Sequence, residues 1–265
     1  MIYSVVKWTY RNVQDKNSRF NNILVRIFEG QIGRMFCDYR VMKDAKDKDR
    51  ISNEAIRLYS DDSLYGYADW NLDKGGETLE KQQRGLILPY LKEKVADYPT
   101  VVEIGTGNGD VIAQLAKEYP KNNFIGVDLS VSVAQEKHKN IRNLTFMKGY
   151  ALELLENKKL KGDLVFASST FVVFTPKELE NYFKEIKKAG FGAIILNEPT
   201  WGGFTGRVSK HMEQACWYHD YAYHIGNIGY ETKTHSFHWK HPKSPRPDIT
   251  INIVEGTRKE SDTHP

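Results

Sequence analysis

The chain has 265 residues, of which 40% are hydrophobic and 12% aromatic, which is enough for a full-sized core and excludes wholesale disorder. Its two cysteines, Cys37 and Cys216, lie far apart without metal-ligand spacing, so we expect no metal site, no disulfide scaffold and a reducing compartment. No secretory signal and no run of roughly 18 apolar residues is visible, so we expect a cytoplasmic protein.

The formal net charge is +4, and residues 1–44 account for it with eight basic and four acidic side chains, 8 − 4 = +4. A basic arm of this kind could bind a nucleic acid, an anionic membrane surface or an acidic partner. The simpler interpretation is a cap helix with a solvated basic face. The sequence does not indicate an oligomeric state.

The segment that follows the arm predicts a boundary, a loop and a helix. Residues 43–50 (KDAKDKDR) are almost all charged and mark the boundary. Residues 63–76 are rich in Gly, Asp and aromatic side chains, which is typical of an ordered loop. Residues 77–96 have helical character, with Pro89 expected to kink or break the helix. We therefore predict an N-terminal basic arm and helical cap over residues 1–97.

From Thr100 onward, short β-rich runs alternate with helical patterns. Ser130 is placed to cap the second helix, and Gly190 to end the third. The strands are predicted at residues 100–105, 124–129, 144–149, 163–168 and 193–199, and the helices at 110–119, 130–139 and 176–189. This alternation predicts an α/β fold with a mostly parallel sheet and helices on both faces.

The alternation stops after Pro199, where residues 200–229 are rich in Trp, Tyr and His. Two further β-rich runs, at residues 230–239 and 249–254, are separated by a proline-rich loop and resemble a hairpin. They bring the predicted sheet to seven strands, 5 + 2. The polar tail from Glu255 onward is expected to fray.

A glycine-rich turn, EIGTGNG, directly follows the first predicted strand. Its glycines let the backbone approach a ligand closely. Their spacing is G-x-G-x-G, whereas a dinucleotide-binding turn reads G-x-G-x-x-G. Glu103, two residues before Gly105, would repel a pyrophosphate but suits a ligand with a cationic end.

Asp128 ends the second predicted strand, where its carboxylate can accept hydrogen bonds from both hydroxyls of a ribose. A ribose and a cationic amino-acid end together describe S-adenosylmethionine (SAM). With EIGTGNG and FIGVDLS at these places, residues 98–256 resemble the Rossmann-like class I SAM-dependent methyltransferases. The aromatic segment of about 200–229 would then be a substrate lid inserted in that domain, and residues 257–265 a polar tail.

The resemblance implies SAM as cofactor, S-adenosylhomocysteine as product, and a role for each matching residue. Gly105 and Gly107 would pass beneath the methionine part, Glu103 would orient its polar end, and Asp128 would hold the ribose. An acidic residue often follows the third strand in this family, whereas this chain has Tyr150 and Ala151 there. The cofactor-binding residues expected from the resemblance are Glu103, Gly105, Thr106, Gly107, Asp128, Leu129, Tyr150, Ala151 and Ser168.

The methyl acceptor is less constrained. Residues 167–171 read ASSTF, which excludes the Asn/Asp-Pro-Pro-aromatic turn of DNA and glutamine amino-methyltransferases. The stretch EYPKNNFIGVD resembles tRNA guanine-N7 methyltransferases, but their downstream Pro/Trp-rich motif is not found. Methyl transfer from a sulfonium needs a general base only when the acceptor must first lose a proton.

The candidates for the acceptor side come mainly from the segment after the fifth strand. Glu198 and His219 are the candidate catalytic residues, although Glu198 could be a cap or ion-pair residue and His219 a structural histidine. The candidate substrate-binding residues are aromatic, and such residues are more often part of a core. They are Tyr65, Tyr67, Trp70, Trp201 and Tyr218.

We therefore predict a SAM-dependent methyltransferase that acts on an oxygen or nitrogen of a small-molecule metabolite. An RNA methyltransferase that uses the basic arm is the alternative. A third possibility is a SAM-binding protein without catalysis, and a related enzyme would transfer another group, such as aminopropyl, from a SAM derivative.

Overall fold

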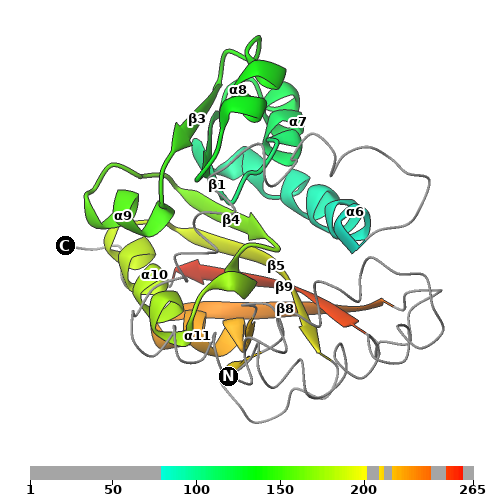
Figure 1. Ribbon diagram of the computed structural model, residues 1–265, viewed down its shortest axis with the longest axis vertical. Helices are drawn as coiled ribbons and strands as arrows, with labels where there is room; N and C mark the ends of the chain where they lie inside the picture. Colours follow the sequence, from blue (N-terminus) through cyan, green and yellow to red (C-terminus); the bar gives the residue numbers. More distant parts are fainter. Residues whose placement is uncertain (1–78, 202–208, 212–216, 240–248, 259–265) are drawn as a thin grey trace, which may run out of the picture.

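The computed structural model describes residues 79–201, 209–211, 217–239 and 249–258, shown in colour in Figure 1. The predicted basic arm, charged boundary and aromatic loop lie outside the described residues. None of the described helices is long and apolar enough to cross a membrane.

A seven-stranded sheet forms the centre of the described fold, in the order β3-β2-β1-β4-β5-β9-β8. The strands are β1 (Thr100–Ile104), β2 (Asn123–Asp128), β3 (Leu144–Lys148), β4 (Leu164–Ser168), β5 (Ala193–Trp201), β8 (Tyr230–Trp239) and β9 (Ile249–Arg258). The pairs among β1 to β5 are parallel, and β9 is antiparallel to both β5 and β8. This confirms the predicted mostly parallel α/β sheet.

Helices cover both faces of the sheet, and each face has its own apolar cluster (Figure 1). The helices α6 (Leu79–Lys92) and α7 (Asp110–Glu118) pack on one face. The other face carries α9 (Ala151–Glu156), α10 (Pro176–Lys188) and α11 (Tyr221–Asn227). Because strand side chains alternate between faces, the sheet contributes to both clusters, as the predicted two-sided packing requires.

Helix α10 shows how the sequence encodes this packing. Leu179, Tyr182, Phe183 and Ile186 follow the i, i+3, i+4, i+7 spacing and are all buried. Thr175 caps the helix, since its hydroxyl accepts the N–H of Glu178. Gly190 follows the last turn with φ +88°, in the place that the sequence predicts.

Several local predictions were wrong. The N-cap of helix α8 (Ser132–His138) is Val131, one residue later than the predicted Ser130. Residues 255–258 do not fray but continue β9, because Glu255 accepts hydrogen bonds from Lys94 and Tyr90 and pairs in the sheet. Helix α6 continues through Pro89, so the alternative of a break there is wrong, whereas the alternative of a kink stays a prediction. Two short helices, α9 and α11, and the strand pair β6 (Ser209–His211) and β7 (Trp217–His219) were not predicted.

The strand order reverses beside β1, whose neighbours β2 and β4 lead to opposite halves of the sheet. In open α/β sheets a ligand-binding crevice forms at this point, outside the carboxyl ends of the strands. The chain places its glycine turn and Asp128 at this edge. The fold therefore gathers the predicted site residues from distant parts of the sequence.

Candidate functional site

A pocket of about 260 Å³ lies at the carboxyl ends of β1, β2 and β4. All nine predicted cofactor-binding residues line it, from Glu103 through Ser168. Side chains from α6, from the loop after β4 and from α10 complete the wall. The structure thus brings together a set of residues that spans the sequence from 83 to 182.

The glycine turn between β1 and α7 forms the floor of the pocket. Gly105 and Gly107 have φ angles of +75° and +55°, a backbone region that favours glycine. A Cβ atom at Gly105 would lie 2.1 Å from the Thr170 hydroxyl oxygen. The position of Gly105 therefore favours glycine both for its conformation and for its close approach to the loop after β4.

Asp128 joins the turn to the end of β2. Its Oδ2 atom accepts the backbone N–H of Gly107 at 2.7 Å. A carboxylate has about four lone-pair sites, so the same group can also accept from ribose hydroxyls. Asp128 therefore fits the predicted ribose site.

Glu103 is a buried carboxyl group in the pocket wall, 4% exposed. Burial raises the pKa of Glu103 to about 8, although the hydroxyl of Thr106, which donates to it at 2.6 Å, opposes this shift. The nearby charge of Asp128 raises the pKa further. A ligand ammonium group placed here would favour the ionised form, so Glu103 is suited to a cationic ligand end.

The wall beside Gly149 and Ala151 is backbone and aromatic surface. The Tyr150 hydroxyl does not point freely into the pocket but donates to the buried Glu178 at 2.7 Å. Phe174 and Tyr182 stack next to it with ring centroids 4.4 Å apart. This wall is suited to the face of a flat aromatic ring such as adenine.

The loop after β4 closes one end of the pocket, and the resemblance to class I methyltransferases implies that the methyl group of SAM lies at this end. Ser168, Ser169 and Thr170 all line this end. Ser169 has a φ of +53°, and its hydroxyl bonds to the side-chain oxygen of Gln83 on α6. Gln83 is 1% exposed, so α6 seals one side of the pocket.

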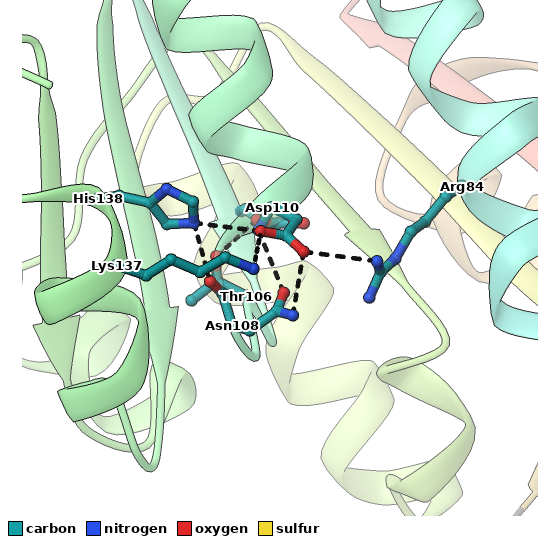
Figure 2. A network of polar contacts seen from close by, with 7 residues as sticks. Arg84, Thr106, Asn108, Asp110, Lys137 and His138 are labelled. Carbon is teal, nitrogen blue, oxygen red and sulfur yellow. Dashed lines mark hydrogen bonds and ion pairs between the residues drawn. The ribbon is translucent and has the colours of Figure 1, made fainter. Parts of the chain in front are cut away.

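Asp110, the first residue of α7, lines the pocket and lies at the centre of a network of polar contacts (Figure 2). Lys137 lies 2.7 Å from its carboxylate, the amide of Asn108 3.1 Å and His138 3.3 Å. Burial alone would raise the pKa of Asp110, but the hydrogen bonds from Lys137 and Asn108 hold that pKa below its usual value. Through these contacts, the network connects Asn108 in the glycine turn with Lys137 and His138 on α8.

Four polar lining residues, on α6 and around the glycine turn, were not predicted: Gln83, Arg84, Asn108 and Asp110. Gln83 and Arg84 belong to a helix in which the sequence pattern does not distinguish them from polar residues on a solvent-exposed face. Only their position after folding places them opposite the glycine turn. Asn108 and Asp110 lie in and directly after that turn, so their proximity to the glycines could have indicated them.

The two candidate catalytic residues stand behind the pocket wall rather than in it. Glu198 is fully buried and accepts the backbone N–H groups of Thr170 and Phe171, both at 3.0 Å. Burial raises the pKa of Glu198 to about 7, opposed by these two hydrogen bonds. Asn197 faces α6, so strand alternation directs Glu198 to the opposite face of the sheet.

His219, on β7, is 1% exposed, and its Nε2 atom lies 2.9 Å from the carbonyl oxygen of Phe174. It therefore supports a wall residue instead of lining the pocket. Tyr218 is buried beside it and does not line the pocket either. Trp201 ends β5, and Tyr65, Tyr67 and Trp70 lie outside the described residues. A catalytic or substrate-binding role for these residues stays a prediction.

His219 gives the fold a pH dependence that can be measured. Burial lowers the pKa of His219 to about 3, against 6.5 in the unfolded chain. The unfolded state therefore binds the proton more strongly, and the histidine destabilises the fold as pH falls from about 6.5 toward 3, by up to roughly 1.4 kcal/mol per pH unit. We expect His219→Gln to flatten this slope in urea titrations at several pH values. An unchanged slope would contradict the neutral buried state.

Comparisons with known proteins agree with this geometry. Residues 101–189 match the family model of a methyltransferase domain. A tRNA (guanine-N(7)-)-methyltransferase from Shewanella piezotolerans is 30% identical over 147 residues, covering 50% of this chain and 61% of that protein. Another of that name, from Francisella philomiragia, is 29% identical over 106 residues, covering 32% and 46%. The chain thus spans about half the length of these relatives.

Solved structures share the fold. Magnesium protoporphyrin IX methyltransferase from Synechocystis PCC 6803, with bound S-adenosylhomocysteine, superposes with a TM-score of 0.54 at 15% identity and covers 78% of this chain and 100% of that one. The N-terminal domain of EvdMO1, also with bound S-adenosylhomocysteine, reaches 0.52 at 13% identity and covers 74% and 95%. Over residues 101–189 the chain therefore matches a methyltransferase domain, and the described fold is the one that these solved structures share.

Proposed function

We propose that this chain transfers the methyl group of SAM to an oxygen or nitrogen atom of a small-molecule acceptor. The observation that carries the proposal is the seal at the methyl end of the pocket. Gln83 on α6 bonds to Ser169 and donates weakly to the carbonyl of Asn197 at 3.5 Å. Asn197 in turn donates to the backbone of Gln83 at 2.9 Å. A confined, neutral wall of this kind favours a small acceptor over a large one.

The described wall around the methyl end contains hydroxyl and amide groups, contributed by Gln83 and residues 168–170. Such groups can position an acceptor by hydrogen bonds. A sulfonium already has a good leaving group, so positioning contributes most when the acceptor atom carries an available lone pair. We therefore favour a nitrogen lone pair or an already ionised oxygen as the acceptor atom.

A tRNA guanine is the second candidate acceptor. The sequence relatives named above act on tRNA according to their names, and residues 1–44 carry the excess of positive charge. Lys and Arg side chains that contact phosphates would make binding strongly salt-dependent. This alternative requires the basic arm, whereas the small-molecule proposal does not.

Radiolabelled SAM separates the two proposals. The protein is incubated with methyl-tritiated SAM and either a filtered small-molecule cell extract or unmodified tRNA transcripts, with Asp128→Ala as the inactive control. We expect label in the small-molecule fraction. Label that is acid-insoluble and released by ribonuclease would overturn the proposal in favour of tRNA. Absence of label in both would contradict both acceptors and support a SAM-binding protein without transfer.

A further inference from the structure

Arg84 contributes the one positive charge among the described residues that line the pocket. The acidic lining residues are Glu103, Asp110 and Asp128. SAM carries a sulfonium, an ammonium and a carboxylate. The three acids suit the cationic groups of SAM. Binding the SAM carboxylate beside these acids would be unfavourable without a positively charged partner. The charge pattern therefore makes Arg84 the natural partner of that carboxylate.

The position of Arg84 agrees with this role. Figure 2 shows its side chain reaching from α6 toward Asp110, while Lys137 and His138 approach Asp110 from the other side. If the ribose lies at Asp128 and the methyl group at residues 168–170, the remaining methionine end lies toward α6 and the start of α7. Arg84 and Asp110 are the charged lining residues on these two helices.

Arg84 can also leave its present partner at little cost. Its Nη1 atom lies 3.6 Å from Asp110 Oδ2, which is too long for a good hydrogen bond. The Arg84 side chain is 41% exposed, and exposed ion pairs contribute little. Asp110 retains Lys137 at 2.7 Å and the Asn108 amide at 3.1 Å when Arg84 moves. A guanidinium can then grip a carboxylate through two parallel hydrogen bonds.

We propose that Arg84 anchors the methionyl carboxylate of SAM and makes this pocket select carboxylated adenosyl ligands over those that lack the carboxylate. The inference rests on the SAM site and is independent of the acceptor. It also separates this pocket from enzymes that use a decarboxylated SAM derivative, such as aminopropyl transferases. Arg84 is thus a positioning and specificity-determining residue rather than a catalytic one.

Calorimetry with two probes tests the proposal in the full-length protein. S-Adenosylhomocysteine carries the carboxylate, whereas 5′-methylthioadenosine keeps adenosine and sulfur but lacks the amino-acid end. We expect Arg84→Gln to weaken S-adenosylhomocysteine binding about 10- to 100-fold, as expected for a charged hydrogen-bonded pair, while 5′-methylthioadenosine binding changes less than about twofold. Arg84→Lys should lie between, because a lysine cannot bind a carboxylate bidentately.

Lys92→Gln is the matched control, since it removes the same charge from the same helix at a residue that pairs with Glu118 and does not line the pocket. It should leave both affinities unchanged. Equal weakening of both probes by Arg84→Gln would show that Arg84 only supports the fold of the pocket, and no weakening of either would show that it does not touch the ligand. Both results overturn the proposal. Failure of the wild-type protein to bind either probe would instead overturn the SAM site itself.

Discussion

Replacing Asp128 by Ala should weaken S-adenosylhomocysteine binding by about 100-fold or more while the protein stays folded. Asp128 lies at the carboxyl end of β2 and lines the pocket, where a ribose would donate two hydrogen bonds to its charged carboxylate. Each hydrogen bond to a charged group contributes about 1.5–3 kcal/mol, so losing two corresponds to at least a 100-fold change. Isothermal calorimetry measures the affinity directly.

Asp163→Ala provides the control for this experiment. Asp163 also accepts a backbone N–H at 2.7 Å, from Thr100, but it does not line the pocket. Asp128→Ala loses the bond of the same kind from Gly107 and a longer one from Ser130 at 3.4 Å. The thermal midpoint should therefore fall for both variants, whereas only Asp128→Ala should lose the ligand. Equal affinity of the two variants for the ligand would contradict the ribose site.

Replacing Glu103 by Gln should make the fold more stable at high pH and the cofactor bind less tightly. The pKa of Glu103 is about 8 in the folded protein, against 4.5 in the unfolded chain. Between these values the native state holds a proton that the unfolded state has lost, so stability falls as pH rises from about 4.5 to 8. Glutamine keeps the shape without the charge. It should raise the free energy of unfolding by roughly 2–4 kcal/mol at pH 9.

The same variant separates stability from function. If Glu103 orients the cationic end of SAM, the ligand draws the carboxyl group into its ionised form and releases a proton near neutral pH. Calorimetric titrations in buffers of different ionisation enthalpy should then report proton release for the wild type and none for Glu103→Gln. A variant that binds SAM as tightly as the wild type, with unchanged proton release, would exclude Glu103 from the site.

The central sheet and the residues that line the pocket around the glycine turn could be predicted from the sequence, because each depends on local patterns. The alternation of strands and helices follows from apolar periodicity, and the glycine turn follows from residue types that tolerate positive φ angles. Asp128 was found by its place at the end of a strand. The rule that parallel strands bring their carboxyl ends to one edge then placed these residues together.

The acceptor side could not be predicted in the same way. Glu198 has the residue type of a catalytic base, but strand alternation directs it away from the α6 side, to the backbone of Thr170 and Phe171. Arg84 and Gln83 reach the pocket only because α6 packs across β4 and β5, a long-range contact that no local pattern reports. A substrate-binding role for the aromatic candidates stays a prediction. These are Tyr65, Tyr67, Trp70, Trp201 and Tyr218.

A crystal structure with S-adenosylhomocysteine would test the account most directly. We expect the ribose hydroxyls at Asp128, the adenine against Gly149 to Ala151, the carboxylate at Arg84 and the sulfur facing residues 168–170. Density for the ligand at any other place, or in this pocket with its amino-acid end directed away from Arg84 and Glu103, would contradict it.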